Sequence, residues 1–389
     1  MIKSSLLSID KKTVKWDKKL AIYTNGDSNA YPEFMEGYKN NSITAKMASS
    51  IMVQFLLGKG FGEADNILIG KTKLIDLADD IAADIVDNRG VFIHVNYNAL
   101  YEVSDFKVLP FKDCRIGEKD SSEYNGKILI YKDWSGKVDT SKVKILNVFN
   151  PDKATVEYQV NKAGGIENYP GQVFYYNMDS QYYYPLSRID PVHLECDIEY
   201  LASVYKKEVM TNGFFGKTLI VTRPLIDKSF IDDDSPEGLE RYRQAQSERD
   251  KFKEGVQDFL GVKKAGGVMH FEVDFAGEKL EDSLVIRNIE SNIDPSMFTD
   301  IENTAMNKIL MAYNNIPIAL VKSPDAALLG NSGTAIRAAK ETYWESTWKE
   351  RNLLETIIND LLKLVQGENY NYVFIQPLLE PLKPEQNDF

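Results

Sequence analysis

The stretch that decides the fold lies near the end of the chain and reads NNIPIALVKSPDAALLGNSG at residues 314–333. The helix before it opens at Asp294-Pro295, because Asp caps helices and Pro is tolerated in a first turn. It ends at Asn314–Pro317, because Pro cannot continue a helix and disfavours helical geometry just before itself. The rest of the stretch is predicted to be a loop. A second helix is predicted over Thr334–Gln366, ended by the glycine that follows.

The predicted second helix is unusually long for a compact domain. A helix of about 30 residues is about 45 Å long at 1.5 Å per residue. Helices in globular proteins average roughly 11–12 residues. The layout therefore favours a component of a larger assembly over a compact enzyme.

Upstream, a small strand–helix–strand unit is inserted between two helices of about 20 residues, Val192–Asn212 and Pro295–Asn314. The unit is predicted to contain a strand at 214–222, a charged helix at 237–259, and strands at 268–275 and 284–288. Helices that lead into and out of a small domain form a stalk with a cap. Apolar residues recur at helical spacing on both helices and need packing partners. They are Leu194, Ile198, Leu201 and Tyr205 on the first helix, and Ile301, Ala305 and Ile309 on the second.

The first 189 residues are predicted to be rich in β-structure, with helices at 42–57 and 74–88 where apolar side chains recur three and four residues apart. Strands are predicted at 91–97, 106–109, 127–131, 145–149, 154–159, 172–177 and 182–186. Short strands separated by Asn-Gly, Ser-Gly and Asn-Pro turns favour a mostly antiparallel sheet. The predicted fold class is therefore α+β.

Composition excludes several classes of protein. The 389 residues include 46 Lys and Arg against 58 Asp and Glu, a net charge of −12, which argues against a protein that scans DNA for sequence. A protein past which DNA slides is not excluded. The two cysteines, Cys114 and Cys196, fit a reducing cytosol. No stretch resembles a signal peptide or a membrane span, so the sequence predicts a soluble, cytoplasmic product with no membrane contact.

Motifs of enzyme chemistry are incomplete. Gly70–Thr72 and Gly216–Thr218 resemble the end of a phosphate-binding loop, but Asp65 and Thr211 stand where that loop needs glycine. His193–Glu195 matches half of a zinc-deaminase signature, and the chain lacks the Pro-Cys-x-x-Cys half. The sequence therefore predicts no enzyme, no cofactor and no metal site.

The order of these elements resembles that of the portal proteins of tailed bacteriophages, particularly the short members of this head-to-tail connector family, over residues 42–374. Portal proteins commonly have a Gly-Val-Pro helix end, a loop with Gly-Asn, and then a long helix. This chain has Asn315-Ile316-Pro317 in place of Gly-Val-Pro, and Gly330-Asn331 in the loop. Leu57–Phe61 and Asp84–Tyr97 also look like the family's N-terminal helix pair and first wing strand.

The resemblance implies a portal-like architecture: a β-rich wing with helices, a two-helix stem, a small α/β clip, a long C-terminal wing helix, and a minimal or absent crown. The implied boundaries are 1–189 for the first part of the wing, 190–213 and 291–316 for the stem helices, 214–290 for the clip, 317–333 for a tunnel loop, and 334–389 for the long wing helix and tail.

The resemblance also implies a function. Portal proteins form a ring, twelve copies in the family, around a channel at the capsid vertex through which double-stranded DNA is packaged and ejected. Its implied partners are the terminase large subunit, the major capsid and scaffold proteins, and the head-completion or adaptor and tail proteins. Its implied location is the virion, and the host cytoplasm during assembly. The apolar residues of the two stem helices are expected to pack between subunits.

The tunnel loop is expected to face the DNA without specificity for its sequence. Our hypothesis is that Lys322, Ser323 and Asn331 make transient contacts with the DNA backbone; the alternative is that Lys322 is solvated or pairs with Asp325. Two other functions stay open at this point: another ring-forming component of a capsid or secretion assembly, and an enzyme without a recognisable motif.

Overall fold

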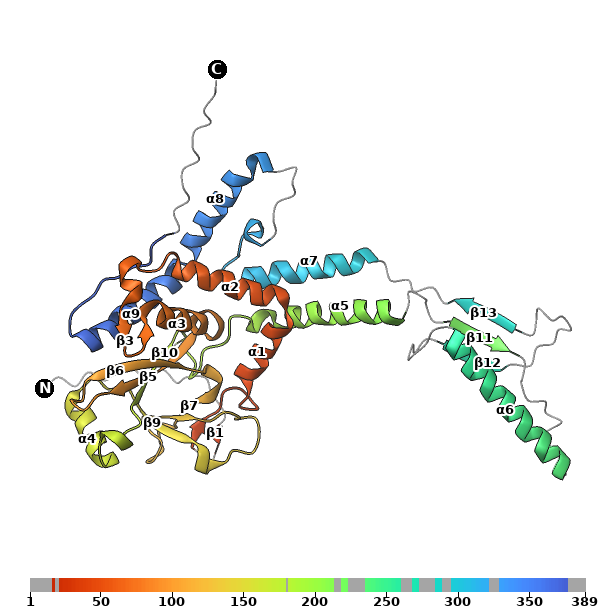
Figure 1. Cartoon of the computed structure of the whole chain (residues 1–389), viewed down its shortest axis with the longest axis horizontal. Coiled ribbons are helices and arrows are strands. Elements are labelled where there is room, and N and C mark those ends of the chain that lie inside the picture. Colours follow the sequence, from red (N-terminus) through yellow and green to blue (C-terminus); the bar gives the residue numbers. More distant parts are fainter. Residues whose placement is uncertain are drawn as a thin grey trace, which may run out of the picture. The chain divides into compact units, whose positions relative to one another are not determined.

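The computed structural model describes residues 16–17, 21–179, 181–212, 218–222, 235–259, 268–272, 284–288, 295–321 and 329–376 (Figure 1). The chain divides into two compact units. Unit 1 consists of residues 1–199 and 304–389, and unit 2, residues 200–303, is inserted into it. Helices α5 (His193–Asn212) and α7 (Pro295–Ala312) carry the chain out of unit 1 and back, as the sequence predicts.

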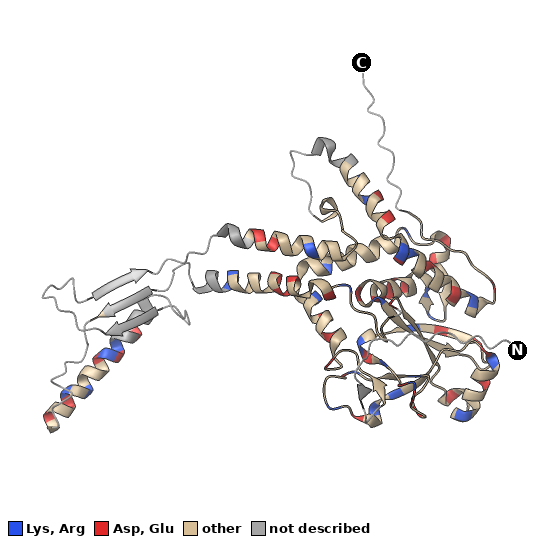
Figure 2. Cartoon of the chain, turned by 180° about the vertical axis from the view of Figure 1, so that it is seen from behind, with Lys and Arg blue, Asp and Glu red and all other residues tan. Residues whose placement is uncertain are grey.

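Unit 2 has the predicted order of strand, helix, strand and strand. The elements are β11 (Thr218–Thr222), α6 (Pro236–Phe259), β12 (Val268–Glu272) and β13 (Leu284–Asn288). The central strand β11 pairs in parallel with β12 and antiparallel with β13. A parallel pair needs a crossover connection, and α6 supplies it. Acidic and basic side chains are mixed along α6 (Figure 2).

The described part of unit 1 contains a six-stranded sheet in the order β6-β5-β10-β9-β8-β7. The strands are β5 (Gly90–Tyr97), β6 (Val103–Leu109), β7 (Cys114–Ile116), β8 (Lys127–Ile130), β9 (Lys144–Val148) and β10 (Gln172–Asn177). All neighbours are antiparallel except β10 and β9, where Gln172 lies opposite Asn147 in a short parallel pairing. The prediction of a mostly antiparallel sheet is confirmed; β7 was not predicted.

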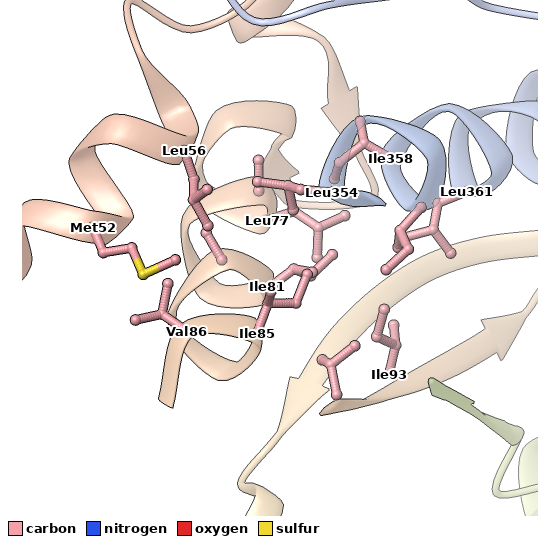
Figure 3. Close-up of a cluster of buried hydrophobic side chains, with 14 of the residues drawn as sticks. Met52, Leu56, Leu77, Ile81, Ile85, Val86, Ile93, Leu354, Ile358 and Leu361 are labelled. Atoms are coloured by element: carbon pink, nitrogen blue, oxygen red, sulfur yellow. The ribbon is translucent and has the colours of Figure 1, made fainter. Parts of the chain in front are cut away.

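Three helices form the main core of unit 1 together with β5. They are α2 (Ile43–Leu57), α3 (Leu74–Asn88) and α9 (Trp348–Gln366). The Ser42 hydroxyl caps α2 by accepting a hydrogen bond from the Ala45 N–H at 3.0 Å. Their apolar side chains lie in one buried cluster (Figure 3). It includes Met52 and Leu56 of α2, Leu77, Ile81 and Ile85 of α3, Leu354, Ile358 and Leu361 of α9, and Ile93 of β5.

Residues 154–159 are not the predicted strand but part of helix α4 (Lys153–Ala163). The Asp152 carboxylate accepts from the Thr155 N–H at 3.1 Å, and Gly164 ends the helix with a left-handed φ of 83°. Both are ordinary helix-end signals. These two helix-end signals outweigh the preference of the side chains between them for a strand.

Residues 182–186 are also not a strand. The carbonyls of Tyr182 and Tyr183 accept from the Asn177 amide at 2.8 and 3.2 Å, and the Tyr175 hydroxyl also donates to the Tyr183 carbonyl at 2.8 Å. Because side chains occupy these acceptors, they are not available to a neighbouring strand. The tyrosine-rich segment instead packs on the sheet, with Tyr184 buried in a cluster with Phe92 of β5 and Val173 of β10.

The long C-terminal helix predicted over 334–366 is two helices, α8 (Leu329–Ser346) and α9, separated at Thr347. The hydroxyls of Ser346 and Thr347 both donate to the Tyr343 carbonyl, at 2.8 and 3.1 Å. Side-chain donors of this kind compete with the helical backbone and bend or end helices. The two helices point in different directions from the junction (Figure 1).

Helix α8 also begins at Leu329 rather than at Thr334, so Gly330 and Gly333 lie inside it. A glycine within a helix costs about 0.5–1 kcal/mol relative to alanine. That cost weakens the first turns but does not prevent a helix of 18 residues. The segment predicted as a loop at 317–333 is correspondingly shorter.

A segment that we call the C-terminal strap, residues 368–376, crosses the end of α2. The Asn359 side chain of α9 accepts from the Tyr372 N–H and donates to the Tyr372 carbonyl, both at 2.9 Å. The Ile375 N–H donates to the Gly60 carbonyl at 2.9 Å. The strap thus connects α9 to the turn that follows α2.

Shorter elements complete the described structure. Helix α1 (Tyr31–Asn41), which was not predicted, contributes Met35 to the core. The remaining strands are β1 (Trp16–Asp17), β2 (Ile22–Tyr23), β3 (Leu68–Ile69) and β4 (Thr72–Lys73). The 3-10 turns are η1 (Gly62–Asn66), η2 (Phe111–Asp113), η3 (Thr140–Lys142), η4 (Ile166–Asn168), η5 (Asp190–Val192) and η8 (Ile318–Leu320).

Candidate functional site

The first part of the candidate site is the α5 stripe, defined as Leu194, Ile198, Leu201 and Tyr205. Their spacing of four, three and four residues places them on one side of the helix. Their exposed fractions are 60, 39, 53 and 38%, whereas Cys196 of the same helix is fully buried. Contiguous apolar side chains left in water mark an interaction surface. The α5 stripe is therefore a candidate for such a surface.

The corresponding residues of α7 are placed differently. Ile309 is fully buried in the core of unit 1, Ala305 is 3% exposed, and Ile301 is half-buried. Ala305 and Ile309 therefore pack within the chain's own structure. Of the seven residues predicted to pack between subunits, the α5 stripe and Ile301 keep exposed surface, and their role stays a prediction.

Helices α5 and α7 lie side by side and are joined by ion pairs (Figure 1). Lys308 donates to the Glu195 carboxylate at 2.7 Å, and this hydrogen bond lowers the pKa of Glu195. Lys206 and Glu302 form a second pair at 2.5 Å. Exposed pairs contribute less than about 1 kcal/mol each, so they align the helices more than they stabilise them.

A buried hinge, defined as Arg188, Asn314 and Glu350, joins the start of α5 to the end of α7 and to α9. The Arg188 guanidinium donates to Glu350 at 3.0 Å, to the Asn314 side-chain oxygen at 2.9 Å, and to the Val86 carbonyl at 3.0 Å. The Asn314 amide donates to Glu350 at 3.2 Å. The two charged side chains are 7 and 10% exposed. A buried charge needs such partners, so the three residues act as one unit.

The junction of α8 and α9 is anchored beside this hinge. The Tyr343 hydroxyl donates to the Tyr313 carbonyl at 2.9 Å, and burial raises the pKa of Tyr343, which keeps it a neutral donor. The Arg351 guanidinium lies 3.5 Å from the centre of the Trp344 ring and donates to the Trp344 carbonyl at 2.9 Å. The chain is therefore held on both sides of the predicted tunnel loop, before it by α7 and after it by α8.

The predicted tunnel-loop residues are not tested by this geometry. Lys322, Ser323 and Asp325 lie outside the described residues. Asn331 lies in the first turn of α8, and its side chain is outside the described part. Their proposed contacts with DNA stay predictions.

The sequence analysis did not identify the hinge, although the sequence contains one signal of it. Asn314 and Asn315 have left-handed φ values of 59° and 56°, a conformation that asparagine adopts more readily than most residues. Two asparagines before Ile-Pro therefore predict a tight reversal after α7. No local pattern identifies Arg188 or Glu350 as their partners.

Two observations on the described residues concern metal ligands and thiols. Within them, no group of three or more His, Cys, Asp or Glu side chains is placed to hold a metal ion. Burial raises the pKa of both thiols, that of Cys196 to about 11, which disfavours the reactive thiolate. None of the helices searched in the described structure has the length and apolar character needed to cross a membrane.

Comparison with known proteins shows which solved structures have a similar fold. No protein-family model and no curated protein matches the chain. A chain in the neck of the empty gene transfer agent (GTA) particle, computed with C6 symmetry, aligns with a TM-score of 0.51 at 12% identity, over 92% of this chain and 85% of that chain. The virion of the native GTA particle gives 0.46 at 13% identity, over 86% and 82%. An HK97 family phage portal protein from Corynebacterium diphtheriae gives 0.30 at 13%, over 73% and 80%.

At these identities the first similarity establishes the fold and nothing further. It extends over nearly the whole chain, including both units. The resemblance predicted from the sequence is confirmed at that level: this chain has the fold of a neck component of a phage-like particle.

Proposed function

We propose that this chain is the portal protein of a phage or phage-like particle, a structural subunit of a ring at the capsid vertex through which double-stranded DNA enters and leaves. The observation that carries the proposal is the fold shared with a neck chain over 92% of this chain. The neck structure that shares this fold was computed with C6 symmetry, which fits a ring. A ring of twelve copies is the form that we propose here.

The α5 stripe supplies the contact between subunits in this proposal. A surface that meets a different surface on the next copy builds a closed ring when the rotation closes. Fully burying a large apolar side chain contributes about 1.5–3 kcal/mol. Leu194, Ile198 and Leu201 are about half exposed, so each has about 1 kcal/mol left to gain from a neighbour. Repeated around a ring, this is a substantial driving force.

The charge of the chain suits a channel that does not grip DNA. Every phosphate neutralised by Lys or Arg adds affinity through counterion release, which would hinder sliding. A subunit of net charge −12, repeated around a ring, keeps such contacts few. We assign the remaining contacts to Lys322, Ser323 and Asn331 of the tunnel loop, with pairing of Lys322 and Asp325 as the alternative.

The clip, residues 214–290, is the part that we propose docks the terminase large subunit and later the head-completion protein. Its helix α6 mixes both signs of charge along its length (Figure 2). Polar contacts are readily exchanged, which suits partners that bind in turn. Contacts with capsid and scaffold proteins, and a place in the virion, belong to the same proposal.

Electron microscopy of the purified full-length chain, with its native mass, tests the proposal. The wild type is expected to form rings with an open centre wide enough for duplex DNA. Leu201→Gln should shift the native mass toward the monomer, because it removes an apolar contact from the centre of the stripe. Lys207→Gln is the matched control, since Lys207 is exposed on the same helix outside the stripe. A monomeric wild type in the presence of capsid and scaffold proteins contradicts the proposal.

A further inference from the structure

The sequence contains three Asn-Gly pairs, and the structure places two of them in opposite surroundings. They are Asn25-Gly26, shortly after β2, and Asn125-Gly126, in the turn between β7 and β8. The third pair, Asn212-Gly213, extends beyond the described residues. An asparagine before glycine is chemically special, because glycine has no side chain to keep its backbone nitrogen away from the asparagine side chain.

The Asn125-Gly126 pair is open to solvent. Both residues are exposed, and a Cβ added to Gly126 would meet no atom within 4 Å. The side-chain amide of Asn125 and the N–H of Gly126 have no hydrogen-bond partner among the described residues. Nothing in the described structure therefore holds these two groups apart or shields them from water.

The Asn25-Gly26 pair is held in place and covered. Asn25 is 4% exposed, its N–H donates to the Asn29 side chain at 2.9 Å, and its carbonyl accepts from the Tyr31 N–H at 3.1 Å. A Cβ added to Gly26 would lie 2.6 Å from the Tyr31 Cβ. A reaction that needs movement of the Asn25 side chain and access of water must therefore wait for local opening of this turn.

We propose that Asn125 is a modification site, at which the folded chain converts asparagine to aspartate and isoaspartate without an enzyme. The Gly126 nitrogen gives up its proton to solvent and attacks the side-chain carbonyl carbon of Asn125. The new C–N bond closes a succinimide, and the side-chain amine takes up a proton and leaves as ammonia.

Water then opens the succinimide at either of its two carbonyl carbons. Cleavage of the bond between the nitrogen and the side-chain carbon gives aspartate. Cleavage of the bond between the nitrogen and the backbone carbon gives isoaspartate. Overall, one water molecule is consumed and one ammonia is released, with no oxidant or reductant.

The isoaspartate product changes the backbone beside β9. Its chain runs through the side-chain carbon, which adds a methylene group to the backbone before Gly126. The Tyr124 carbonyl accepts from the Lys127 N–H across this point at 3.0 Å, and the Gly126 carbonyl accepts from the Val148 N–H at 2.9 Å. Because the longer backbone displaces these acceptors, the end of β9 is expected to loosen.

Peptide mass spectrometry of the full-length chain, aged at mildly alkaline pH, measures conversion at both positions. Asn125 is expected to convert at least about tenfold faster than Asn25, because only Asn25 must wait for local opening. Asn125→Gln is the matched variant, and it should stay unconverted because its longer side chain would have to close a larger cycle. No conversion of Asn125 in the folded chain, or equal rates at the two asparagines, overturns the proposal.

The same measurement in urea separates the fold from the local sequence. With both turns unfolded, the two rates should agree within about threefold, because a glycine follows each asparagine. A difference that stays at about tenfold in urea would come from the neighbouring residues and would overturn the structural argument.

Hydrogen exchange at the Val148 amide tests the effect on β9. The isoaspartate fraction of the aged chain is expected to exchange this amide at least about tenfold faster than the fresh chain. Asn125→Asp adds the charge without lengthening the backbone and should exchange as the fresh chain does. Unchanged exchange in the isoaspartate fraction, or an equal increase in Asn125→Asp, contradicts the loosening of β9. Both readouts use the chain alone and do not require a ring.

Discussion

Replacing Glu350 with alanine removes the carboxylate that pairs with Arg188 at 3.0 Å and also accepts from the Asn314 amide at 3.2 Å. The guanidinium then stays buried, at 7% exposure, without a counter-charge. Removing one partner of a buried ion pair typically costs about 3–5 kcal/mol. Arg188 keeps three neutral acceptors, the Val86 and Ala312 carbonyls and the Asn314 side chain, so we expect the lower end, about 3 kcal/mol.

The loss is expected to be local, at the end of α7 and the start of α9. Backbone hydrogen exchange measures it at the amides of Asn315, Ile316 and Arg351, which bond within these segments. A loss of 3 kcal/mol at about 1.4 kcal/mol per tenfold corresponds to roughly 100-fold faster exchange. Glu350→Gln keeps a neutral acceptor and should lose about half as much free energy.

The matched control for this experiment is Lys308→Ala, which breaks the exposed pair with Glu195. It should change the free energy of local opening by less than about 1 kcal/mol, or roughly fivefold in exchange rate. Exchange in Glu350→Ala within threefold of the wild type would refute the reasoning. In that case the hinge residues would not act as one unit.

Three further predictions address other parts of the chain. Ile309→Ala should lower the free energy of unfolding by about 2–5 kcal/mol in urea denaturation, whereas Leu194→Ala should leave it within about 0.5 kcal/mol and weaken only ring formation. Gly58→Ala should loosen the C-terminal strap, because Gly58 has φ 55° and a Cβ there would lie 2.4 Å from the Ile375 carbonyl; limited proteolysis of residues 368–376 should become faster. Because burial raises the pKa of Asp84, its contribution to stability is present below its unfolded pKa and is lost as the pH rises through about 7. Asp84→Asn should therefore flatten that part of the curve of unfolding free energy against pH. A curve that does not change in the variant contradicts the prediction.

Helices and strands that are marked by a pattern in their own residues could be predicted from the sequence. The limits of α3 at 74–88 and of β13 at 284–288 agree with the structure, because periodicity and flanking turn residues mark them. Helix α4 was mistaken for a strand because Thr155, Val156 and Tyr158 favour strands. Its capping residues were present in the sequence and predict the helix when they are read first.

Contacts between distant residues could not be predicted in this way. Arg188 and Glu350 are 162 positions apart, and neither lies in a recognisable motif. The same holds for Asp84 of α3 and Tyr313 after α7, which are far apart in the sequence but line one cavity. The helical spacing of Ile309 was correctly seen, but spacing alone does not tell a protomer's own core from a contact with a neighbour.

The insertion of unit 2 into unit 1 imposes an order of events on the ribosome. Ile81 of α3 and Ile358 of α9 share one core but are translated on opposite sides of residues 200–303. At about 5–20 residues per second, the insertion alone delays α9 by about 5–20 s. During that time the faces of α3 and β5 that α9 later covers are open to water and to chaperones. Because Glu350 of α9 completes the hinge at the start of α5, the contacts that hold the start of α5 are complete only after α9 has left the ribosome.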